Sequence, residues 1–194
     1  MATPPRRLLA ATLGVALIAG VVAASLHPAP GAGFRLVDSA GQPHALDGFP
    51  PGTVLAIYFG YTTCLRACPV ALDNIAAALD ELGAEAAGVR PVFVDLDPDR
   101  LALANMALYL ESFGAGFLGL TGSPEALAEA TRAFAVRVER LRFSAEPGDY
   151  AMTHLSPIFV MRPDDPQPVA LPADSAPEAI TAALRKALRP PAPA

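Results

Sequence analysis

The chain has 194 residues, of which 53% are hydrophobic and 17% are charged, so one folded domain with a sizeable core is expected and global disorder is excluded. The formal net charge is −5 at pH 7, and no long run of basic residues occurs. Nucleic-acid binding therefore has no support in the composition.

The chain begins with an apolar segment. Arg6 and Arg7 precede the uncharged run from Leu8 to Leu26, which as a helix would span roughly 28 Å, about the thickness of a bilayer core. Because positive charge before such a run keeps the N-terminus in the cytoplasm, we predict that residues 1–26 are a single membrane anchor and that the rest is exported. The small residues at 22–24 leave a cleaved signal peptide as the alternative.

One domain is expected after the anchor. Residues 27–33 are rich in proline and glycine and predict a short linker, and residues 34–188 are expected to form the domain. Residues 189–194 are too rich in proline to continue a helix and predict a flexible tail. Lys186 is the only lysine beside thirteen arginines, a bias typical of GC-rich bacterial genomes. We therefore expect a single-pass protein of a bacterial cytoplasmic membrane, with its domain on the periplasmic side.

The first predicted strands lead to the only two cysteines. Residues 34–46 predict two short strands around a turn. The continuous apolar run at 52–61 follows a Pro-Gly pair and predicts a buried central strand. Cys64 and Cys68 come next, in the stretch TTCLRACP.

A helix is predicted after the cysteines. Leu72, Ile75 and Leu79 recur at helical spacing, and Gly83 follows as a stop signal. Pro69 fits the first turn, where its missing N–H costs nothing.

Strands and helices then alternate along the rest of the chain. This order predicts an α/β domain with parallel central strands. A C-x-x-x-C motif where the first buried strand meets a helix fits a thioredoxin-like fold, with a central mixed sheet flanked by helices. The remaining predicted elements are a strand at 90–97, a helix at 100–113, a strand at 116–122, a helix capped by Ser123, a late hairpin of strands at 134–143 and 155–163, and a helix at 177–188.

The two cysteines suggest three kinds of chemistry. Their i, i+4 spacing puts both sulfurs on one helical face or in one tight loop. A structural disulfide would close a very short loop and remove little entropy from the unfolded chain, so this interpretation is the weakest. Two thiolates suit a soft ion such as Cu(I), which accepts few ligands, better than zinc, which takes four. A redox pair, with Cys64 attacking and Cys68 resolving, also remains open.

A copper site with two thiolates would gain from an added imidazole. His27 lies in the predicted linker, and His44 lies in the N-terminal hairpin. His154 precedes a predicted strand, and from a loop it would reach the carboxyl ends of the parallel strands, where functional residues gather. A lone histidine is more often a surface residue than a ligand, so both interpretations of His154 stay open.

A short run of aspartates follows the second buried strand. Asp95 and Asp97 share one face of a strand and, with Asp99, invite a metal interpretation. The better interpretation is that Asp97 caps a helix with Pro98 in its first turn.

Four segments resemble one known family. FGYTTCLRACPVALDNIAAAL, VFVDLDPDR, GLTGSPEALAEATRAFAV and MTHLSPIFVM occur in the order and spacing of the Sco/SenC family. The resemblance covers roughly residues 34–188, together with the anchor in general layout. Members of this family resemble thioredoxin in fold, are usually tethered by one N-terminal helix and are implicated in copper delivery to cytochrome c oxidase.

The resemblance implies a set of ligands and a function. Cys64, Cys68 and His154 would bind copper, as Cu(I) or alternatively as Cu(II). The implied function is a membrane-tethered copper(I) metallochaperone that supplies the copper-bearing subunit of cytochrome c oxidase, with other copper chaperones or thiol reductants as further partners. If the protein is instead an enzyme, it would be a thiol–disulfide oxidoreductase that uses Cys64 and Cys68 to reduce cysteines of that subunit.

Three acidic positions of the family pattern are replaced in this chain. Residues 65–67, between the cysteines, are Leu-Arg-Ala, Leu101 follows the DPDR stretch, and Thr153 precedes the histidine. Arg66 introduces a positive charge that would offset the net negative charge of Cu(I) held by two thiolates and a neutral imidazole. The alternative is that Arg66 points into solvent and contributes little.

Overall fold

The computed structural model describes one domain. The predicted anchor and linker at 1–33 lie outside the described residues, as does the tail beyond Arg189, so these assignments remain predictions. Among the residues that are described, no helix is long and apolar enough to cross a membrane. The described residues are 34–100, 103–114, 116–144, 146, 150–165 and 168–189.

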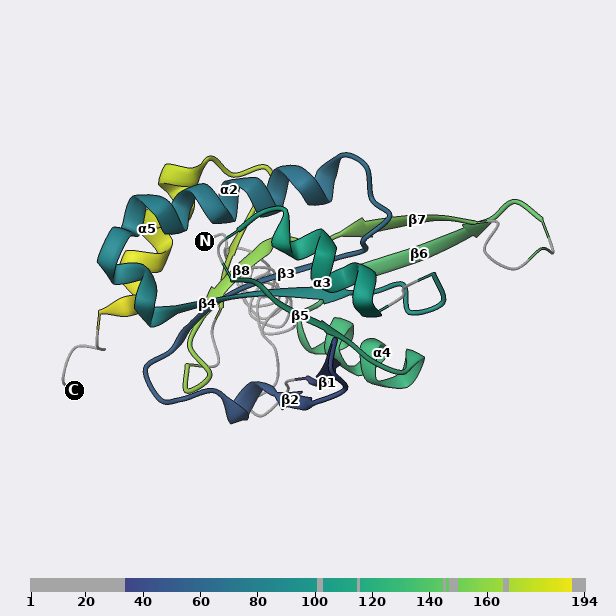
Figure 1. Ribbon diagram of the computed structural model, residues 1–194, viewed down its shortest axis with the longest axis horizontal. Helices are drawn as coiled ribbons and strands as arrows, with labels where there is room; N and C mark the ends of the chain where they lie inside the picture. The colour runs from purple at the N-terminus through teal and green to yellow at the C-terminus, as the bar shows by residue number, and fades with distance from the viewer. Residues whose placement is uncertain are drawn as a thin grey trace, which may run out of the picture.

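The domain is built on a seven-stranded mixed sheet (Figure 1), as the sequence predicted. Its strands are β1 (Arg35–Asp38), β2 (Pro43–Ala45), β3 (Val54–Gly60), β4 (Val89–Asp95), β5 (Leu118–Thr121), β8 (Ile158–Met161) and β9 (Val169–Leu171). Their order across the sheet is β2-β1-β5-β4-β3-β8-β9. The central strands β3, β4 and β5 are parallel, whereas the strands toward both edges pair antiparallel.

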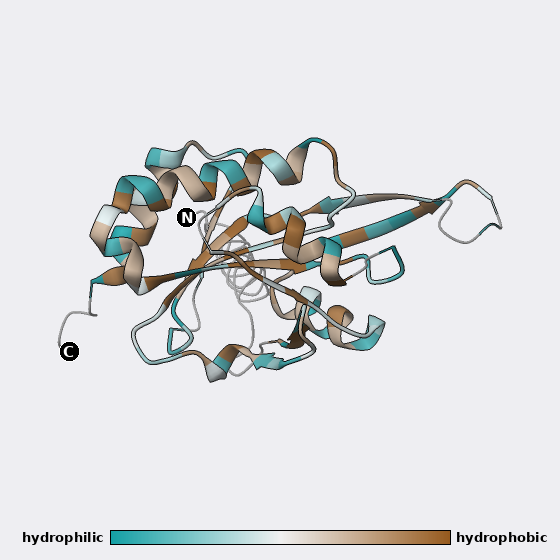
Figure 2. Ribbon diagram, in the orientation of Figure 1, coloured by the Kyte–Doolittle hydropathy of each residue, from teal (hydrophilic) through white to brown (hydrophobic). Residues whose placement is uncertain are grey.

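Every residue of β3 is buried, because both faces of the sheet are covered. Alternate side chains enter different cores: Leu55, Ile57 and Phe59 lie on one face, and Ala56 and Tyr58 lie on the other. The continuous apolar run in the sequence is thus the pattern of a central strand. Figure 2 shows the middle of the sheet in the brown of hydrophobic residues.

Helices cover both faces of the sheet. Three helices, α2 (Ala67–Leu82), α3 (Leu103–Glu111) and α5 (Pro177–Leu188), pack on the face that carries Tyr58. The fourth helix, α4 (Pro124–Ala133), packs on the opposite face. Two 3₁₀ helices, η1 (Leu46–Gly48) and η2 (Gly83–Gly88), occur in connecting segments.

Three of the predicted helix signals are confirmed. The Ser123 side chain accepts a hydrogen bond of 3.2 Å from the Ala126 N–H at the start of α4. Gly83 ends α2 with a φ of 58°, a left-handed conformation that costs glycine little. Pro69 lies in the first turn of α2, where its lack of an N–H leaves no bond unmade.

The predicted late hairpin is wrong in its second strand. Strand β6 (Arg137–Arg142) pairs with β7 (Tyr150–Leu155), which forms where a loop was expected. These two strands form a separate ribbon that projects from the body, and we call it the β6–β7 hairpin (Figure 1). The segment expected to form the second strand, residues 155–163, contains β8 instead. Strand β8 pairs with β3 in the main sheet, and all its side chains are buried there. Strand β9 was not predicted.

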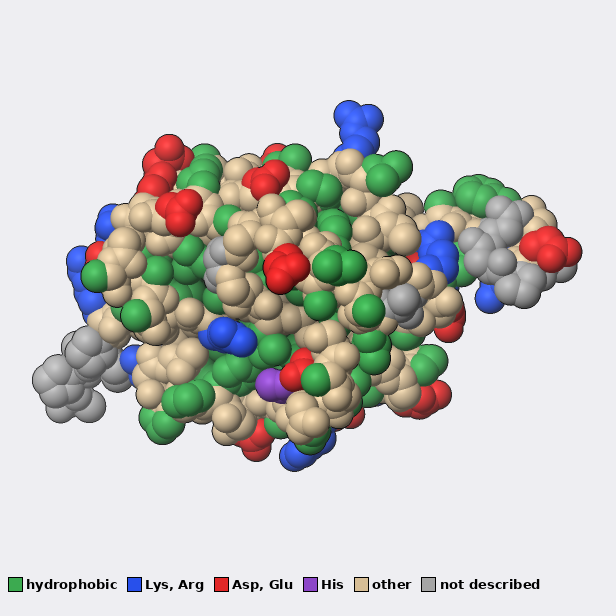
Figure 3. All heavy atoms as spheres, viewed as in Figure 1, with side chains coloured by type: hydrophobic (Ala, Val, Ile, Leu, Met, Phe, Trp, Pro, Cys, Tyr) green, Lys and Arg blue, Asp and Glu red, His purple; other side chains and the backbone are tan. Residues whose placement is uncertain are grey.

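The surface carries no broad basic region on the face seen in Figure 3. Acidic and basic side chains lie scattered there between apolar and neutral ones. This distribution agrees with the absence of basic runs in the sequence.

Candidate metal centre and redox pair

Both cysteines lie at the junction between β3 and α2. Cys64 belongs to the loop after β3, and its N–H donates a hydrogen bond of 3.0 Å to the Tyr61 carbonyl. Cys68 lies in the first turn of α2, and its N–H points at the Cys64 Sγ at 3.4 Å. Both are free thiols, with Cys68 fully buried and Cys64 8% exposed. The Cys64 sulfur thus lies at the positive end of α2, and Cys64 is the less deeply buried of the two.

Asp95 fixes the start of this loop. It is fully buried at the end of β4, where its carboxylate accepts hydrogen bonds of 2.8 Å from the N–H groups of Thr62 and Asp97. The Leu96 N–H also donates to the Gly60 carbonyl at 2.8 Å. Burial raises the pKa of Asp95. Asp95 therefore holds the carboxyl ends of two neighbouring strands together and is not part of the metal-ligating group.

Asp97 is not a helix cap. Residues 98–100 form a turn, and the described part of α3 begins only at Leu103. The Asp97 carboxylate instead accepts a hydrogen bond of 2.5 Å from the Arg100 Nε and another from the Tyr150 hydroxyl. This corrects the helix-cap interpretation, because the side chains of Arg100 and of the distant Tyr150 replace the expected backbone N–H groups.

His154 reaches the cysteines from β7. It lies opposite Val138 in the β6–β7 hairpin, so it belongs to a strand and not to the loop that was expected. Its Nε2 is 3.6 Å from the Cys68 Sγ. The hairpin therefore brings a residue 86 positions away onto the first turn of α2.

Three potential ligand atoms form a compact group. The sulfurs of Cys64 and Cys68 and a ring nitrogen of His154 all lie within 4.8 Å of one another. Within the described parts of the chain, this is the one group of three or more potential ligands that could hold a metal ion. His44 lies elsewhere and pairs with Asp38 at 2.9 Å.

The two thiols differ in acidity. Burial raises the pKa of the Cys64 thiol, but hydrogen bonds from Cys68 and from the N–H groups of Arg66 and Cys68 outweigh burial and bring it below the usual thiol value. Burial, together with the neighbouring Cys64 sulfur, raises the pKa of the Cys68 thiol well above that value. Cys64 is thus the more readily formed thiolate.

His154 is held as a neutral imidazole. Burial lowers its pKa, because a protonated ring would lose its hydration. Its Nδ1 atom is buried without a hydrogen-bond partner in the described structure. A neutral ring whose Nε2 faces Cys68 is the form that binds a soft metal ion.

Two tyrosines complete the surroundings of the site. Tyr58 lies with its hydroxyl 3.9 Å from the Cys68 Sγ, and Tyr61 donates a hydrogen bond of 3.1 Å to the Met152 carbonyl. Both rings meet the His154 ring edge-on, with centroids 6.0 and 5.5 Å away. Burial and the Cys64 sulfur raise the pKa of Tyr61 to about 12, so its hydroxyl remains a donor. These roles were not predicted from the sequence, in which the only signal is the group of aromatic residues at 58, 59 and 61 just before the cysteines.

The site opens to the surface beside exposed apolar residues. Leu65 is 90% exposed between the cysteines, and Leu155 is 73% exposed directly after the histidine. A groove of about 540 Å³ opens beside His154, and Tyr58, Leu155 and Leu171 contribute to its lining. Arg66 is exposed, so its side chain is accessible to solvent, as the second interpretation expected.

The difference in thiol acidity predicts selective alkylation. Iodoacetamide should modify Cys64 of the reduced protein first, because its thiolate forms at lower pH and because Cys68 is fully buried. The rate should rise with pH to a midpoint below that of an ordinary thiol, because the pKa of Cys64 is lowered. Mass spectrometry of peptides at successive pH values measures both. Faster labelling of Cys68 would contradict the assignment.

Gly60 leaves space for the Cys68 sulfur. A Cβ at Gly60 would lie 2.9 Å from this sulfur and 2.8 Å from the Phe93 ring. Gly60→Ala should therefore displace the sulfur and lower the free energy of unfolding by about 1–3 kcal/mol, as overpacking does in other cores. Urea unfolding measures the loss. Gly48→Ala is the control, since no heavy atom lies within 4 Å of the Cβ that it would add.

Comparison with known proteins agrees with this geometry. The profile of the family described as SCO1/SenC matches residues 23–189. The mouse mitochondrial protein SCO2 homolog is 38% identical over 137 residues, which cover 68% of this chain and 51% of that protein. The protein sco1 of Schizosaccharomyces pombe is 33% identical over 146 residues, or 74% of this chain and 55% of that protein. The chain thus spans about half the length of these relatives.

Solved structures show the same fold. Bradyrhizobium japonicum ScoI with copper bound superposes with a TM-score of 0.69 at 30% identity, covering 80% of this chain and 97% of that one. Yeast Sco1 with copper bound gives a TM-score of 0.71 at 27% identity, covering 82% and 90%.

Proposed function

Because the chain belongs to the SCO1/SenC family, we propose that it is a copper(I) metallochaperone that supplies cytochrome c oxidase during its assembly. The observation that carries this proposal is the group formed by Cys64, Cys68 and His154, whose ligand atoms lie within 4.8 Å of one another. The copper-bound structures of two relatives support it.

The donor set suits Cu(I). Two thiolates are soft ligands that Cu(I) prefers, and a neutral imidazole completes a three-coordinate site. Zinc would require a fourth ligand or a bound water in addition. In this proposal the protein transfers copper to an acceptor, so its site must release the ion as well as bind it. A three-ligand site leaves room for an incoming ligand, and the groove beside His154 would give that ligand access.

The cellular setting belongs to the same proposal. Residues 1–26 would anchor the protein in a bacterial cytoplasmic membrane by a single span, and residues 27–33 would link the anchor to a periplasmic domain at 34–188, followed by a flexible tail at 189–194. The partner would be the copper-bearing subunit of the oxidase, with other copper chaperones or thiol reductants acting before it. The apolar run after Arg6 and Arg7 and the family resemblance support this setting.

Anaerobic titration of the reduced full-length chain with Cu(I) tests the proposal. One equivalent should bind, and X-ray absorption should count two sulfur neighbours and one nitrogen neighbour around the ion. Failure to bind, or binding without sulfur neighbours, would exclude the proposed site.

A second function is favoured by the unequal acidity of the two thiols. Cys64 would attack a disulfide of the acceptor subunit as a thiolate, forming a mixed disulfide and releasing one acceptor thiol. Cys68 would then lose its proton and attack Cys64, which releases the second acceptor thiol and leaves the Cys64–Cys68 disulfide. An external thiol reductant would have to restore the pair. Reduction of a model dithiol peptide disulfide by the copper-free protein measures this activity.

A further inference from the structure

The position of His154 depends on how the β6–β7 hairpin is attached to the body. In the described structure, β6 and β7 pair only with each other and not with the seven-stranded sheet. Side chains from the rest of the domain therefore donate hydrogen bonds to backbone carbonyls of β7, as the N–H groups of a neighbouring strand would do in a larger sheet. The Arg100 Nη1 donates to the Tyr150 carbonyl at 3.1 Å, and the Tyr61 hydroxyl donates to the Met152 carbonyl at 3.1 Å.

Tyr150 is the centre of the attachment at the start of β7. Its hydroxyl donates a hydrogen bond to Asp97. The guanidinium groups of Arg100 and Arg140 lie 4.1 and 5.0 Å from the centre of its ring. We call Asp97, Arg100, Arg140 and Tyr150 the Tyr150 latch.

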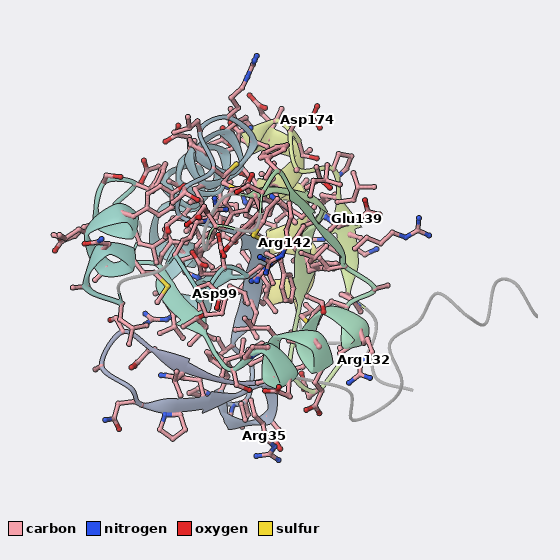
Figure 4. All side chains as sticks on the ribbon, turned by 90° about the vertical axis from the view of Figure 1, so that its right-hand side faces the viewer. Arg35, Asp99, Arg132, Glu139, Arg142 and Asp174 are labelled. Atoms are coloured by element: carbon pink, nitrogen blue, oxygen red, sulfur yellow. The ribbon has the colours of Figure 1, made fainter. Side chains whose placement is uncertain are left out.

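Ion pairs hold the Tyr150 latch together in addition to the contacts of the Tyr150 ring. Asp97 is 2% exposed, and it pairs with the Arg100 Nε at 2.5 Å and with an Arg140 Nη at 3.5 Å. Arg140 also pairs with Asp99 at 2.5 Å. A buried carboxylate is stable only while such partners stay in place, so the loop after β4 and the hairpin are coupled. In Figure 4, which views the end where the hairpin projects, Arg142 marks β6 and Asp99 marks that loop.

Tyr150 and His154 share one face of β7. Side chains alternate along a strand, so residues 150, 152 and 154 point to the same side, and Tyr150 lies about 13 Å along the strand from His154. This inward face carries Tyr150 and Met152 into the core and His154 onto Cys68. Loss of the Tyr150 contacts would therefore allow the start of β7 to move, and His154 near the end of the same strand would move with it.

We propose that the Tyr150 latch positions His154 against the two cysteines, so that Tyr150, Asp97 and Arg100 act on copper binding through the imidazole without touching the ion. The proposal rests on the proposed function, since the latch is assigned to the same copper site. It adds residues outside the ligand set, from the turn after β4 and from strands β6 and β7.

The test is a double-mutant cycle on the full-length chain. Tyr150→Phe removes one hydroxyl and keeps the ring between the guanidiniums. We expect it to weaken Cu(I) binding about tenfold, the lower end of the effect of partners that orient a ligand. In the His154→Ala background, the same substitution should change the affinity less than about twofold, because no imidazole remains to be positioned. Equal losses in both backgrounds, or no loss in the native background, would overturn the proposal.

Tyr109→Phe is the matched control. The Tyr109 hydroxyl is also buried, but it has no hydrogen-bond partner in the described structure. Its removal should leave copper affinity unchanged, and a loss as large as that of Tyr150→Phe would overturn the proposal. Arg100→Lys is a second latch variant that keeps the charge, and it should behave as Tyr150→Phe does in both backgrounds.

A copper-free readout separates the latch from the proposed function. In the NMR spectrum of the reduced protein, Tyr150→Phe should shift or broaden the ring signals of His154, whereas Tyr109→Phe should not. If the native protein takes up no Cu(I), the proposed function fails, and this spectrum still decides the latch. Unchanged His154 signals in Tyr150→Phe would overturn it.

Discussion

Oxidation of Cys64 and Cys68 to a disulfide should abolish Cu(I) binding, and reduction should restore it. Only thiolates bind the ion, and the disulfide removes both of them at once. The free sulfurs already lie within 4.8 Å of each other, so the bond can form with a small local movement. Copper uptake by the oxidised and the re-reduced protein, measured after removal of unbound metal, gives the result.

The single variants Cys64→Ser and Cys68→Ser serve as controls for this experiment. Neither can form the disulfide, so their copper binding should be weak both before and after oxidant treatment. Equal copper uptake by the reduced and the oxidised native protein would place the binding site elsewhere and contradict the assignment.

His154→Ala should leave a protein that still binds copper but holds it poorly. Both thiolates remain, and these soft ligands supply most of the affinity. The binding free energy of a four-ligand structural zinc site is about 10–16 kcal/mol, which is roughly 3 kcal/mol for each ligand. By the same measure, loss of the imidazole should lower the affinity for copper on the order of a hundredfold. X-ray absorption should show two sulfur neighbours without the nitrogen. Delivery of copper to the oxidase should fall sharply, because competing thiols would remove a weakly held ion.

The same variant separates the two proposed functions. Disulfide exchange needs only the Cys64 thiolate and its partner sulfur, so it should survive in His154→Ala. His44→Ala is the matched control, since His44 pairs with Asp38 outside the metal group. Unchanged copper affinity and coordination in His154→Ala would show that this histidine is no ligand, and the oxidoreductase would then be the better proposal.

The sequence by itself determined many of the strands and helices, through the local pattern of apolar residues. The run at 52–61 predicted a buried strand, because its apolar, aromatic and β-branched residues have no polar face. Leu72, Ile75 and Leu79 determined a helix that buries one side, and Gly83 determined its end. The C-x-x-x-C motif placed both thiols at the junction of strand and helix, and the resemblance added His154 to them.

The tertiary structure alone decided how the distant residues meet. The short β7 has no strong alternation of apolar residues, so only its pairing with β6 shows that His154 lies on a strand. Asp97 looked like a helix cap because its sequence neighbours suit a cap, but its partners Tyr150 and Arg140 reach it only in the fold. The difference in acidity between Cys64 and Cys68 likewise depends on burial and on N–H groups of the folded helix. Local sequence determines which elements form, whereas contacts between residues far apart in the chain determine the chemistry of the site.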